Sequence, residues 1–209
     1  MKNLLLIIAS FLFIGCSSGS PKDGALVSVK KIPEITVSDY IYTLGEVTIK
    51  WTAFKHSAKA QVGGKFKSAE LKGFIESTNL STAISGVTFK IPVASTSTND
   101  EVRDYKIINS FFNTMVDTDS ISGKILSIDE NGSGKLVINM NGQEVEKQYK
   151  WEMDQTSKEI YLKTSIDVLN WGAQSSLDAL NEVCLEQHTG PDGKNVLWPN
   201  VDITVIVDL

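Results

Sequence analysis

A two-residue alternation of apolar and polar side chains recurs along most of this 209-residue chain. In residues 47–53, for example, Val47, Ile49, Trp51 and Ala53 alternate with polar residues. Successive side chains of a β-strand point to opposite faces, so this pattern predicts a strand with one buried face. Similar patterns predict further strands at residues 61–66, 69–77, 84–93, 120–129, 135–140, 145–153, 160–166 and 201–209.

Tight turns join several of these strands. Asn131-Gly132 and Asn141-Gly142 each connect two predicted strands, and Asn-Gly favours hairpins because both residues tolerate positive φ. Consecutive strands without a regular strand–helix–strand order indicate an antiparallel meander. A meander of about eight strands usually closes into a barrel, which can enclose one small ligand. We therefore expect a mainly β chain that forms an antiparallel barrel of eight or so strands.

Two segments have helical spacing instead. Residues 101–115 carry apolar side chains three to four positions apart, and they follow Asn99-Asp100, which can cap a helix. Residues 171–188 contain Ser175-Ser176-Leu177-Asp178, which has the shape of a capping box with Asp in place of Glu. We therefore expect two helices to be inserted between the strands.

The N-terminus has the parts of an export signal. Met1-Lys2-Asn3 is basic, residues 4–14 are apolar apart from Ser10, and Gly15-Cys16 follows at once. The apolar run is shorter than the roughly 20 residues that cross a bilayer. Phe13-Ile14-Gly15-Cys16 also resembles a bacterial lipobox, in which cleavage precedes a cysteine that carries fatty acyl chains such as palmitate. The alternative is an ordinary signal peptide that happens to contain a cysteine.

These features predict three parts of the chain. Residues 1–15 would be a lipoprotein signal peptide, residues 16–44 would hold the lipidated Cys16 and a flexible polar linker, and residues 45–209 would form the barrel domain. The mature protein is expected to be exported to the bacterial cell envelope and held there by its lipid anchor, at the outer membrane or facing the periplasm.

Composition limits the partners. The formal net charge is −5, and no cluster of Lys and Arg offers a binding surface for nucleic acid. A domain of this size buries about 70% of its unfolded surface, so it needs neither a metal nor a disulfide to fold. The cysteines are Cys16 and Cys184, and they cannot pair if Cys16 is acylated. We expect no nucleic acid partner and no cofactor.

Catalytic and metal-binding motifs are weak in this sequence, which lacks GxSxG, HExxH, CxxC and a phosphate-binding loop. Cys184, His188 and Asp192 could form a nucleophilic set, but Cys184 shares an apolar helical face with Leu177 and Leu180, which favours a buried thiol. His56 and His188 are the only histidines, and a metal site built from them would need carboxylate ligands as well. We therefore expect neither an enzyme nor a metal site.

Aromatic side chains offer the best candidates for ligand contacts. Most of them lie on the faces of strands that are predicted to point inward, where they would either fill a core or line an apolar cavity. The sequence does not separate these two alternatives. The candidate ligand-binding residues are Trp51, Phe66, Phe74, Phe89, Tyr149 and Trp151.

The order of these features resembles the YceI-type family of exported lipid-binding proteins. The resemblance covers residues 45 to 209. It is carried by residues 47–53 with their Trp, Gly64-Lys65-Phe66 followed by Gly73-Phe74, residues 103–113 with their Phe-Phe pair, residues 122–125, residues 134–142 and residues 201–205.

This resemblance implies a lipocalin-like antiparallel barrel that binds a long isoprenoid or a related amphiphilic lipid, without catalysis. Residues 171–198 form a longer insertion than many members have, and this insertion could cover a barrel mouth or fill the interior. The expected partners are a hydrophobic small molecule and, through the N-terminal anchor, a membrane. The alternative is an envelope structural or adhesion domain with a filled barrel that acts through its surface.

Overall fold

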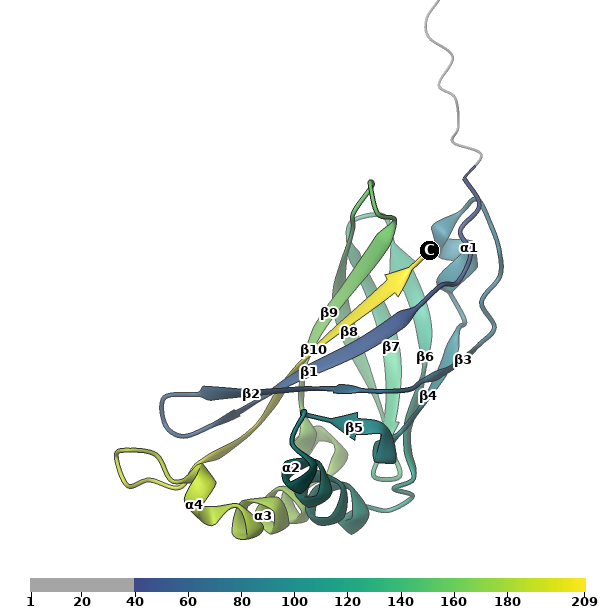
Figure 1. The fold of residues 1–209 in the computed structure, drawn as a ribbon. Coiled ribbons are helices and arrows are strands. Elements are labelled where there is room, and N and C mark those ends of the chain that lie inside the picture. The colour runs from purple at the N-terminus through teal and green to yellow at the C-terminus, as the bar shows by residue number, and fades with distance from the viewer. Residues whose placement is uncertain (1–39) are drawn as a thin grey trace, which may run out of the picture. The chain divides into compact units, whose positions relative to one another are not determined.

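The computed structural model describes residues 40–209. The predicted signal peptide, Cys16 and most of the linker lie outside the described residues. The fold is mainly β, as predicted, and its strands form one antiparallel sheet in the order β3-β4-β6-β7-β8-β9-β10-β1-β2-β5 (Figure 1). The strands are β1 (Val47–Lys55), β2 (Ala60–Phe66), β3 (Glu70–Lys72), β4 (Thr88–Pro92), β5 (Thr96–Ser97), β6 (Ser120–Asp129), β7 (Ser133–Met140), β8 (Gln143–Met153), β9 (Glu159–Asp167) and β10 (Leu197–Asp208).

The strand order begins with β3 and ends with β5, and these two edge strands are joined through their neighbours in the chain. β2 runs on into β3, and β4 runs on through a 3₁₀ turn, η1 (Val93–Ser95), into β5. β2 pairs with β5 and β3 pairs with β4, both antiparallel. Between the two ladders, Lys67 N donates to Ser95 O at 2.8 Å. The sheet therefore closes, and if β2–β3 and β4–β5 each count as one bent strand, the ten segments make a barrel of eight strands.

The hairpins of the second half follow the predicted turns. β7 and β8 pair from Met140↔Gln143 onward, and both Asn141 and Gly142 between them have positive φ. That geometry is the one in which Asn-Gly favours a two-residue hairpin. β9 then pairs with β10, and β10 pairs with β1 along almost the whole length of β1. The local turn chemistry thus sets the register of the β7–β8 hairpin, whereas the pairing of β10 joins segments far apart in the chain.

Two predicted strands are shorter than expected. The strand predicted at 69–77 spans only Glu70–Lys72, and the strand predicted at 84–93 begins at Thr88. Between these two strands lies a short helix that the sequence analysis missed, α1 (Leu80–Ile84), which buries Ala83 and Ile84. Its start is capped, because Asn79 Oδ1 accepts a hydrogen bond from Thr82 N at 2.9 Å.

The helix predicted at 101–115 is present. It begins as α2 (Glu101–Lys106), continues as a π-helical turn, η2 (Ile107–Phe111), and ends as a 3₁₀ turn, η3 (Phe112–Thr114). Asp100 is its N-cap, as predicted, and its carboxylate accepts from Arg103 N at 3.1 Å.

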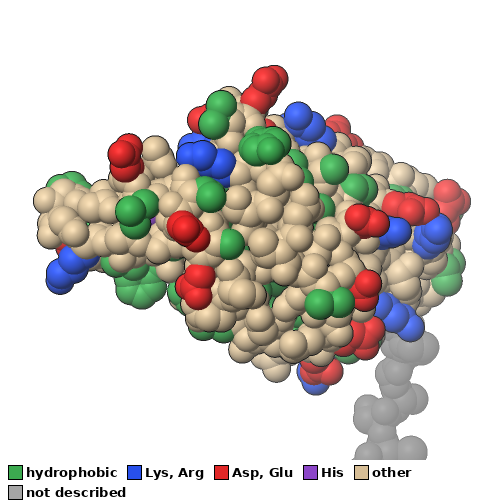
Figure 2. All heavy atoms as spheres, turned by 90° about the horizontal axis from the view of Figure 1, so that it is seen from below, with side chains coloured by type: hydrophobic (Ala, Val, Ile, Leu, Met, Phe, Trp, Pro, Cys, Tyr) green, Lys and Arg blue, Asp and Glu red, His purple; other side chains and the backbone are tan. Residues whose placement is uncertain are grey.

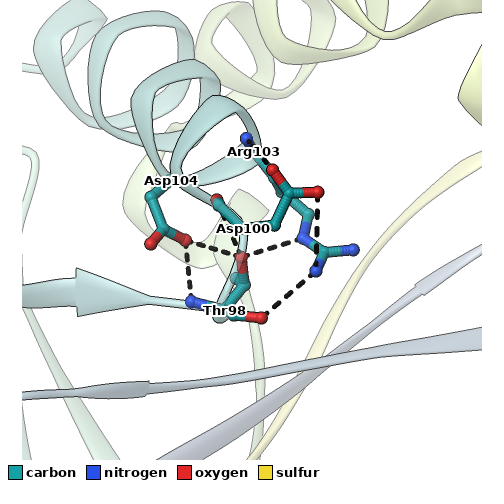
Figure 3. Close-up of polar contacts among 4 residues, drawn as sticks. All are labelled: Thr98, Asp100, Arg103 and Asp104. Atoms are coloured by element: carbon teal, nitrogen blue, oxygen red, sulfur yellow. Dashed lines mark hydrogen bonds and ion pairs between the residues drawn. The ribbon is translucent and has the colours of Figure 1, made fainter.

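A compact polar network joins the start of α2 to the end of β5 (Figure 3). Asp104 Oδ1 accepts from Thr98 N at 2.7 Å and from Thr98 Oγ1 at 2.6 Å. Arg103 Nε donates to Thr98 Oγ1 at 2.9 Å, and Arg103 Nη2 donates to Thr98 O at 3.2 Å. Thr98 is buried, so its polar groups depend on these bonds. The network holds the helix in a fixed position relative to the barrel wall.

The insertion after β9 is helical, as predicted, but it begins differently. It contains a 3₁₀ turn, η4 (Val168–Trp171), then α3 (Gln174–Val183) and α4 (Leu185–His188). The predicted capping box at Ser175 is wrong, because α3 begins at Gln174 and its N-cap, Ala173, makes no side-chain cap bond. Fully buried Trp171 anchors the segment instead, and its Nε1 donates to Ile138 O at 3.0 Å.

The helices lie at opposite ends of the barrel. Figure 1 shows α2 and α3 beneath one end and α1 near the other end, close to the C-terminus. At the lower end, Thr114 Oγ1 donates to Ser176 Oγ at 2.8 Å and so connects η3 to α3. The insertion therefore covers one end of the barrel.

Candidate ligand-binding cavity

The barrel encloses an apolar cavity of about 260 Å³. Its wall is built from both the sheet and the helices at the lower end. Along β10, Val201, Ile203, Val205 and Val207 line the cavity, whereas Asp202 between them is exposed. The predicted two-residue alternation thus sorts the inner from the outer side chains of the strand. The volume falls just below the range of about 300–1,000 Å³ that is typical of small-molecule pockets.

The cavity wall carries almost no polar side chains. Among residues 40–209, Lys163 and Thr164 are the only lining residues of charged or hydroxyl type apart from Tyr149. The Lys163 ammonium lies on the outside, where it pairs with the exposed Glu152 carboxylate at 2.5 Å. Thr164 Oγ1 donates to Gln148 O at 2.8 Å. The cavity therefore offers an apolar surface without a charged group to a molecule inside it.

Five of the six predicted ligand-binding aromatics line this cavity: Trp51, Phe66, Phe74, Phe89 and Tyr149. Tyr149 is almost completely buried, and its hydroxyl donates to Ser127 O at 2.7 Å. Burial, together with the charge of Asp129, raises the pKa of Tyr149, so this side chain is a neutral part of the wall. Contact between these residues and a ligand remains a prediction.

Trp151 does not line the cavity. Its indole Nε1 donates to Asp129 O at 3.0 Å and to Ser133 O at 3.1 Å, so it covers the turn between β6 and β7. The side chain packs against the core from there. The alternation correctly placed Trp151 on the inward face of β8. It did not indicate how far along the barrel the cavity extends, and Trp151 lies beyond the end of the cavity.

The sequence analysis allowed the insertion at residues 171–198 to cover a barrel mouth, but it named no helical residue as part of the cavity wall. Ile107, Phe111 and Phe112 from η2 and η3, and Leu177 and Leu180 from α3, all line the cavity. Their helical spacing indicated only a buried face. Helical spacing does not distinguish a helix that packs on a sheet from one that closes a cavity. The signal that pointed to this segment was the Phe-Phe pair, Phe111 and Phe112, which was part of the family resemblance.

The residues of the alternative nucleophilic set have other contacts. His188 Nδ1 lies 2.9 Å from Asn181 Oδ1, and the Asp192 carboxylate accepts from Lys194 N at 3.1 Å. Burial, followed by the nearby charges of Lys55, His56 and Lys106, lowers the pKa of His188 to about 4. Cys184 is a buried free thiol, as predicted.

The histidines lie near one another at the end of the β1–β2 hairpin. His56 Nε2 lies 3.0 Å from Gln187 O, and Trp198 Nε1 donates to His56 O at 2.8 Å. Within residues 40–209, no group of three or more His, Cys, Asp or Glu side chains is arranged to hold a metal ion.

In the same part of the chain, no helix combines the length and the apolarity needed to traverse a bilayer.

Comparison with known proteins identifies the fold. No protein-family model matches the sequence, and no curated protein matches it. A polyisoprenoid-binding domain from Saccharophagus degradans, implicated in plant cell wall breakdown, is similar with a TM-score of 0.54 and 11% identity, over 77% of this chain and 91% of that one. Burkholderia cenocepacia BcnA is similar with a TM-score of 0.52 and 10% identity, over 77% of this chain and 94% of its own. The chain therefore shares its barrel fold with these two proteins, which confirms the antiparallel, lipocalin-like barrel predicted from the sequence.

Proposed function

We propose that this protein binds a hydrophobic or isoprenoid-like lipid inside its barrel and has no catalytic role. The observation that carries the proposal is the cavity of about 260 Å³, whose wall is apolar on both its sheet side and its helix side. Such a wall stabilises a ligand by removing its apolar surface from water, at about 2.5 kcal/mol per 100 Å² before the costs of association. Within residues 40–209, the wall presents no charged group that a ligand inside the cavity would have to desolvate.

The structural comparison supports the ligand class. The Saccharophagus degradans domain, which has a similar fold, is described as binding polyisoprenoid. A cavity of about 260 Å³ suits a single short chain, or one segment of a longer chain, better than a complete long isoprenoid. The proposed ligand is therefore a slender, single-chain lipid or lipid segment.

A pair of substitutions on one strand tests this proposal. Val205 lines the cavity and Asp202 is exposed on the opposite face of β10. Val205→Trp is expected to fill the cavity, whereas Asp202→Trp adds the same side chain outside it. Mass spectrometry of organic extracts from the purified full chain should find a co-purifying lipid on the wild type and on Asp202→Trp, and at least severalfold less on Val205→Trp. Circular dichroism checks that both variants fold.

Two results would count against lipid binding. One is a wild-type protein whose extract is clean even after exposure to isoprenoids and fatty acyl compounds. The other is an equal amount of lipid on Val205→Trp and Asp202→Trp, which would place the lipid outside the barrel.

A membrane anchor at Cys16 is the second part of the proposal. The N-terminal apolar run and the lipobox-like residues 13–16 support it. One diacylated cysteine supplies two acyl chains, which is enough for stable anchoring. Cys16→Ser should move the protein from the membrane fraction to the soluble fraction, and Cys184→Ser should leave it in the membrane fraction. Retention of Cys16→Ser in the membrane fraction would contradict the anchor.

The alternative of a filled barrel that acts through its surface has less support. It would need a continuous exposed apolar patch, because such patches mark interaction surfaces. Figure 2 shows the face that carries the helical end, where hydrophobic side chains are scattered among charged ones and do not gather into one patch. This face therefore offers no such patch, and the cavity of about 260 Å³ is the observation that favours lipid binding in the interior.

A further inference from the structure

The cavity extends along the barrel to the helices at both of its ends (Figure 1). Ile84 of α1 lines the cavity at one end, and Leu177 and Leu180 of α3 line it at the other. Strand residues surround the space between the two helices. A single-chain ligand that fills this space therefore has one end near α1 and the other end near α3.

Hydrogen bonds hold the start of α3 against the barrel. Just before the helix, Trp171 Nε1 donates to Ile138 O at 3.0 Å, and Asn141 Nδ2 donates to Trp171 O at 2.7 Å. In the first turn of the helix, the hydroxyl of buried Ser176 accepts from Thr114 Oγ1 at 2.8 Å. The start of α3 is therefore fixed to β7, to the β7–β8 turn and to η3.

The end of α3 is held as well. Asn181 Nδ2 donates to Asn195 Oδ1, and Asn181 Oδ1 lies 2.9 Å from Nδ1 of buried His188. The following helix, α4, is joined to the end of β1, because Lys55 Nζ donates to Gln187 O at 2.8 Å. A ligand that pushed α3 outward would have to break bonds on both sides of the helix. This wall can therefore limit the length of a chain inside the barrel.

The α1 end of the barrel is covered less completely. Leu44 lines the cavity just before β1, yet 39% of its surface is exposed. At the α3 end, the lining residues that the helices contribute are all apolar within residues 40–209. A polar group without a partner is costly to bury in such surroundings. A lipid therefore fits best with its polar group near Leu44 and its apolar tail toward α3.

We propose that α3 is the end stop of the lipid site. The apolar tail of the ligand ends against Leu177 and Leu180, and these two side chains set the length of chain that the barrel accepts. This inference rests on the proposed function, since it needs a lipid in the cavity. It narrows that function, because it makes tail length the property by which this protein selects its ligand.

A series of straight-chain primary alcohols, from hexanol to hexadecanol, tests the end stop. Their dissociation constants are measured by displacement of a fluorescent apolar dye from the full chain. Each further CH₂ group that the cavity buries should tighten binding about fourfold, whereas carbons beyond the cavity should add almost nothing. The affinity of the wild-type protein should therefore rise steeply with chain length and stop rising at one length, which is the limit to be compared among variants.

Substitutions in α3 should move this limit in opposite directions. Leu180→Ala removes three carbon atoms from the end wall, and a helix that is held on both sides closes only part of the space. The limit should lengthen by about two carbons, and the longest alcohols should bind about tenfold more tightly. Leu180→Phe should shorten the limit. Val183 is exposed on the same helix, so Val183→Ala and Val183→Phe should both keep the wild-type limit.

The possible failures are distinguishable. If affinity keeps rising through hexadecanol in the wild type, the barrel has no end stop. If the Leu180 variants have the same limit as the Val183 variants, α3 is not the end stop, while lipid binding in the interior stands. If no alcohol displaces the dye from the wild type, the proposed function fails and this inference fails with it.

General loss of stability cannot imitate the expected result, because it would not move the limit in opposite directions. Circular dichroism checks that each variant folds. Leu177→Ala should also lengthen the limit, and it takes the place of Leu180→Ala if that variant does not fold.

Discussion

Single glycines on the strands allow large side chains to lie close to the backbone of the neighbouring strand. The indole of Trp51 occupies the space that a Cβ atom at Gly64 would need, and the ring of Tyr149 does the same at Gly134. Gly123 is the most crowded, since a Cβ atom there would lie 2.0 Å from Val137 O and 2.4 Å from Phe89 Cζ. Glycine at these positions therefore places three of the predicted aromatics in the cavity wall.

A prediction follows for Gly123. Gly123→Ala should destabilise the protein by about 1–3 kcal/mol, because a backbone carbonyl has to move to admit the methyl group. Gly63→Ala is the matched control, because its nearest contact would be Trp51 O at an ordinary 3.9 Å. Urea denaturation of the three proteins gives the free energies of unfolding. Equal free energies of unfolding for Gly123→Ala and Gly63→Ala would contradict this prediction, because the backbone around Gly123 would then admit a methyl group without cost.

At the scale of elements, the helical segment between β5 and β6 forms part of the cavity wall. Its π-helical turn brings Ile107 and Phe111 to the cavity together with Phe112, whose ring centroid lies 6.5 Å from that of Phe66 on β2. π-helical turns occur frequently at functional sites. The network of Thr98, Arg103 and Asp104 fixes the start of this segment on the barrel (Figure 3).

The network makes a second prediction. Asp104→Ala removes two acceptor bonds and leaves the buried Thr98 N–H and hydroxyl without them, which should cost about 1–3 kcal/mol of unfolding free energy. Asp104→Asn keeps an oxygen in the same place and should cost less. Thermal and chemical denaturation measure the difference between the two variants. If Asp104→Asn is as unstable as Asp104→Ala, the carboxylate acts through its charge and not through the bonds to Thr98.

At the scale of the whole molecule, the insertion after β9 and the β1–β2 hairpin are fastened together. Lys55 Nζ donates to Gln187 O at 2.8 Å, His56 N donates to Val196 O at 2.9 Å, and buried His188 contacts Asn181. His188 is neutral at pH 7, because burial and neighbouring positive charges lower its pKa to about 4. Its protonation therefore affects the stability of the whole fold.

The third prediction concerns pH. His188 has a lower pKa folded than the ordinary value of about 6.5, so the unfolded chain binds more protons between these two values. The stability that neutral His188 contributes is complete above about pH 6.5 and is lost as the pH falls toward 4, by up to about 3 kcal/mol. The free energy of unfolding of His188→Gln should fall less steeply over this window. Parallel slopes for variant and wild type would contradict the role assigned to His188.

Local sequence determined the strands of this barrel and the set of side chains that face inward. Alternation and Asn-Gly turns depend only on neighbouring residues, so they predicted β1, β6–β10 and most of the aromatic wall. α1 escaped prediction, because its five residues are too few to show a helical period. The Ser175 capping box failed, because α3 already begins at Gln174 and no side chain caps its start.

Tertiary structure decided whether the barrel is filled. The volume left inside depends on the distance between opposite walls and on how far α3 covers the end, and neither is encoded in the period of any one strand. Trp51 and Trp151 have the same alternation pattern, yet only in the assembled barrel does the Trp51 side chain line the cavity while the Trp151 indole N–H donates to carbonyls of the turn between β6 and β7. The sequence by itself therefore determined which side chains point inward. The closed barrel decided which of them meet a cavity, because both the space and the hydrogen-bond partners come from residues far apart in the chain.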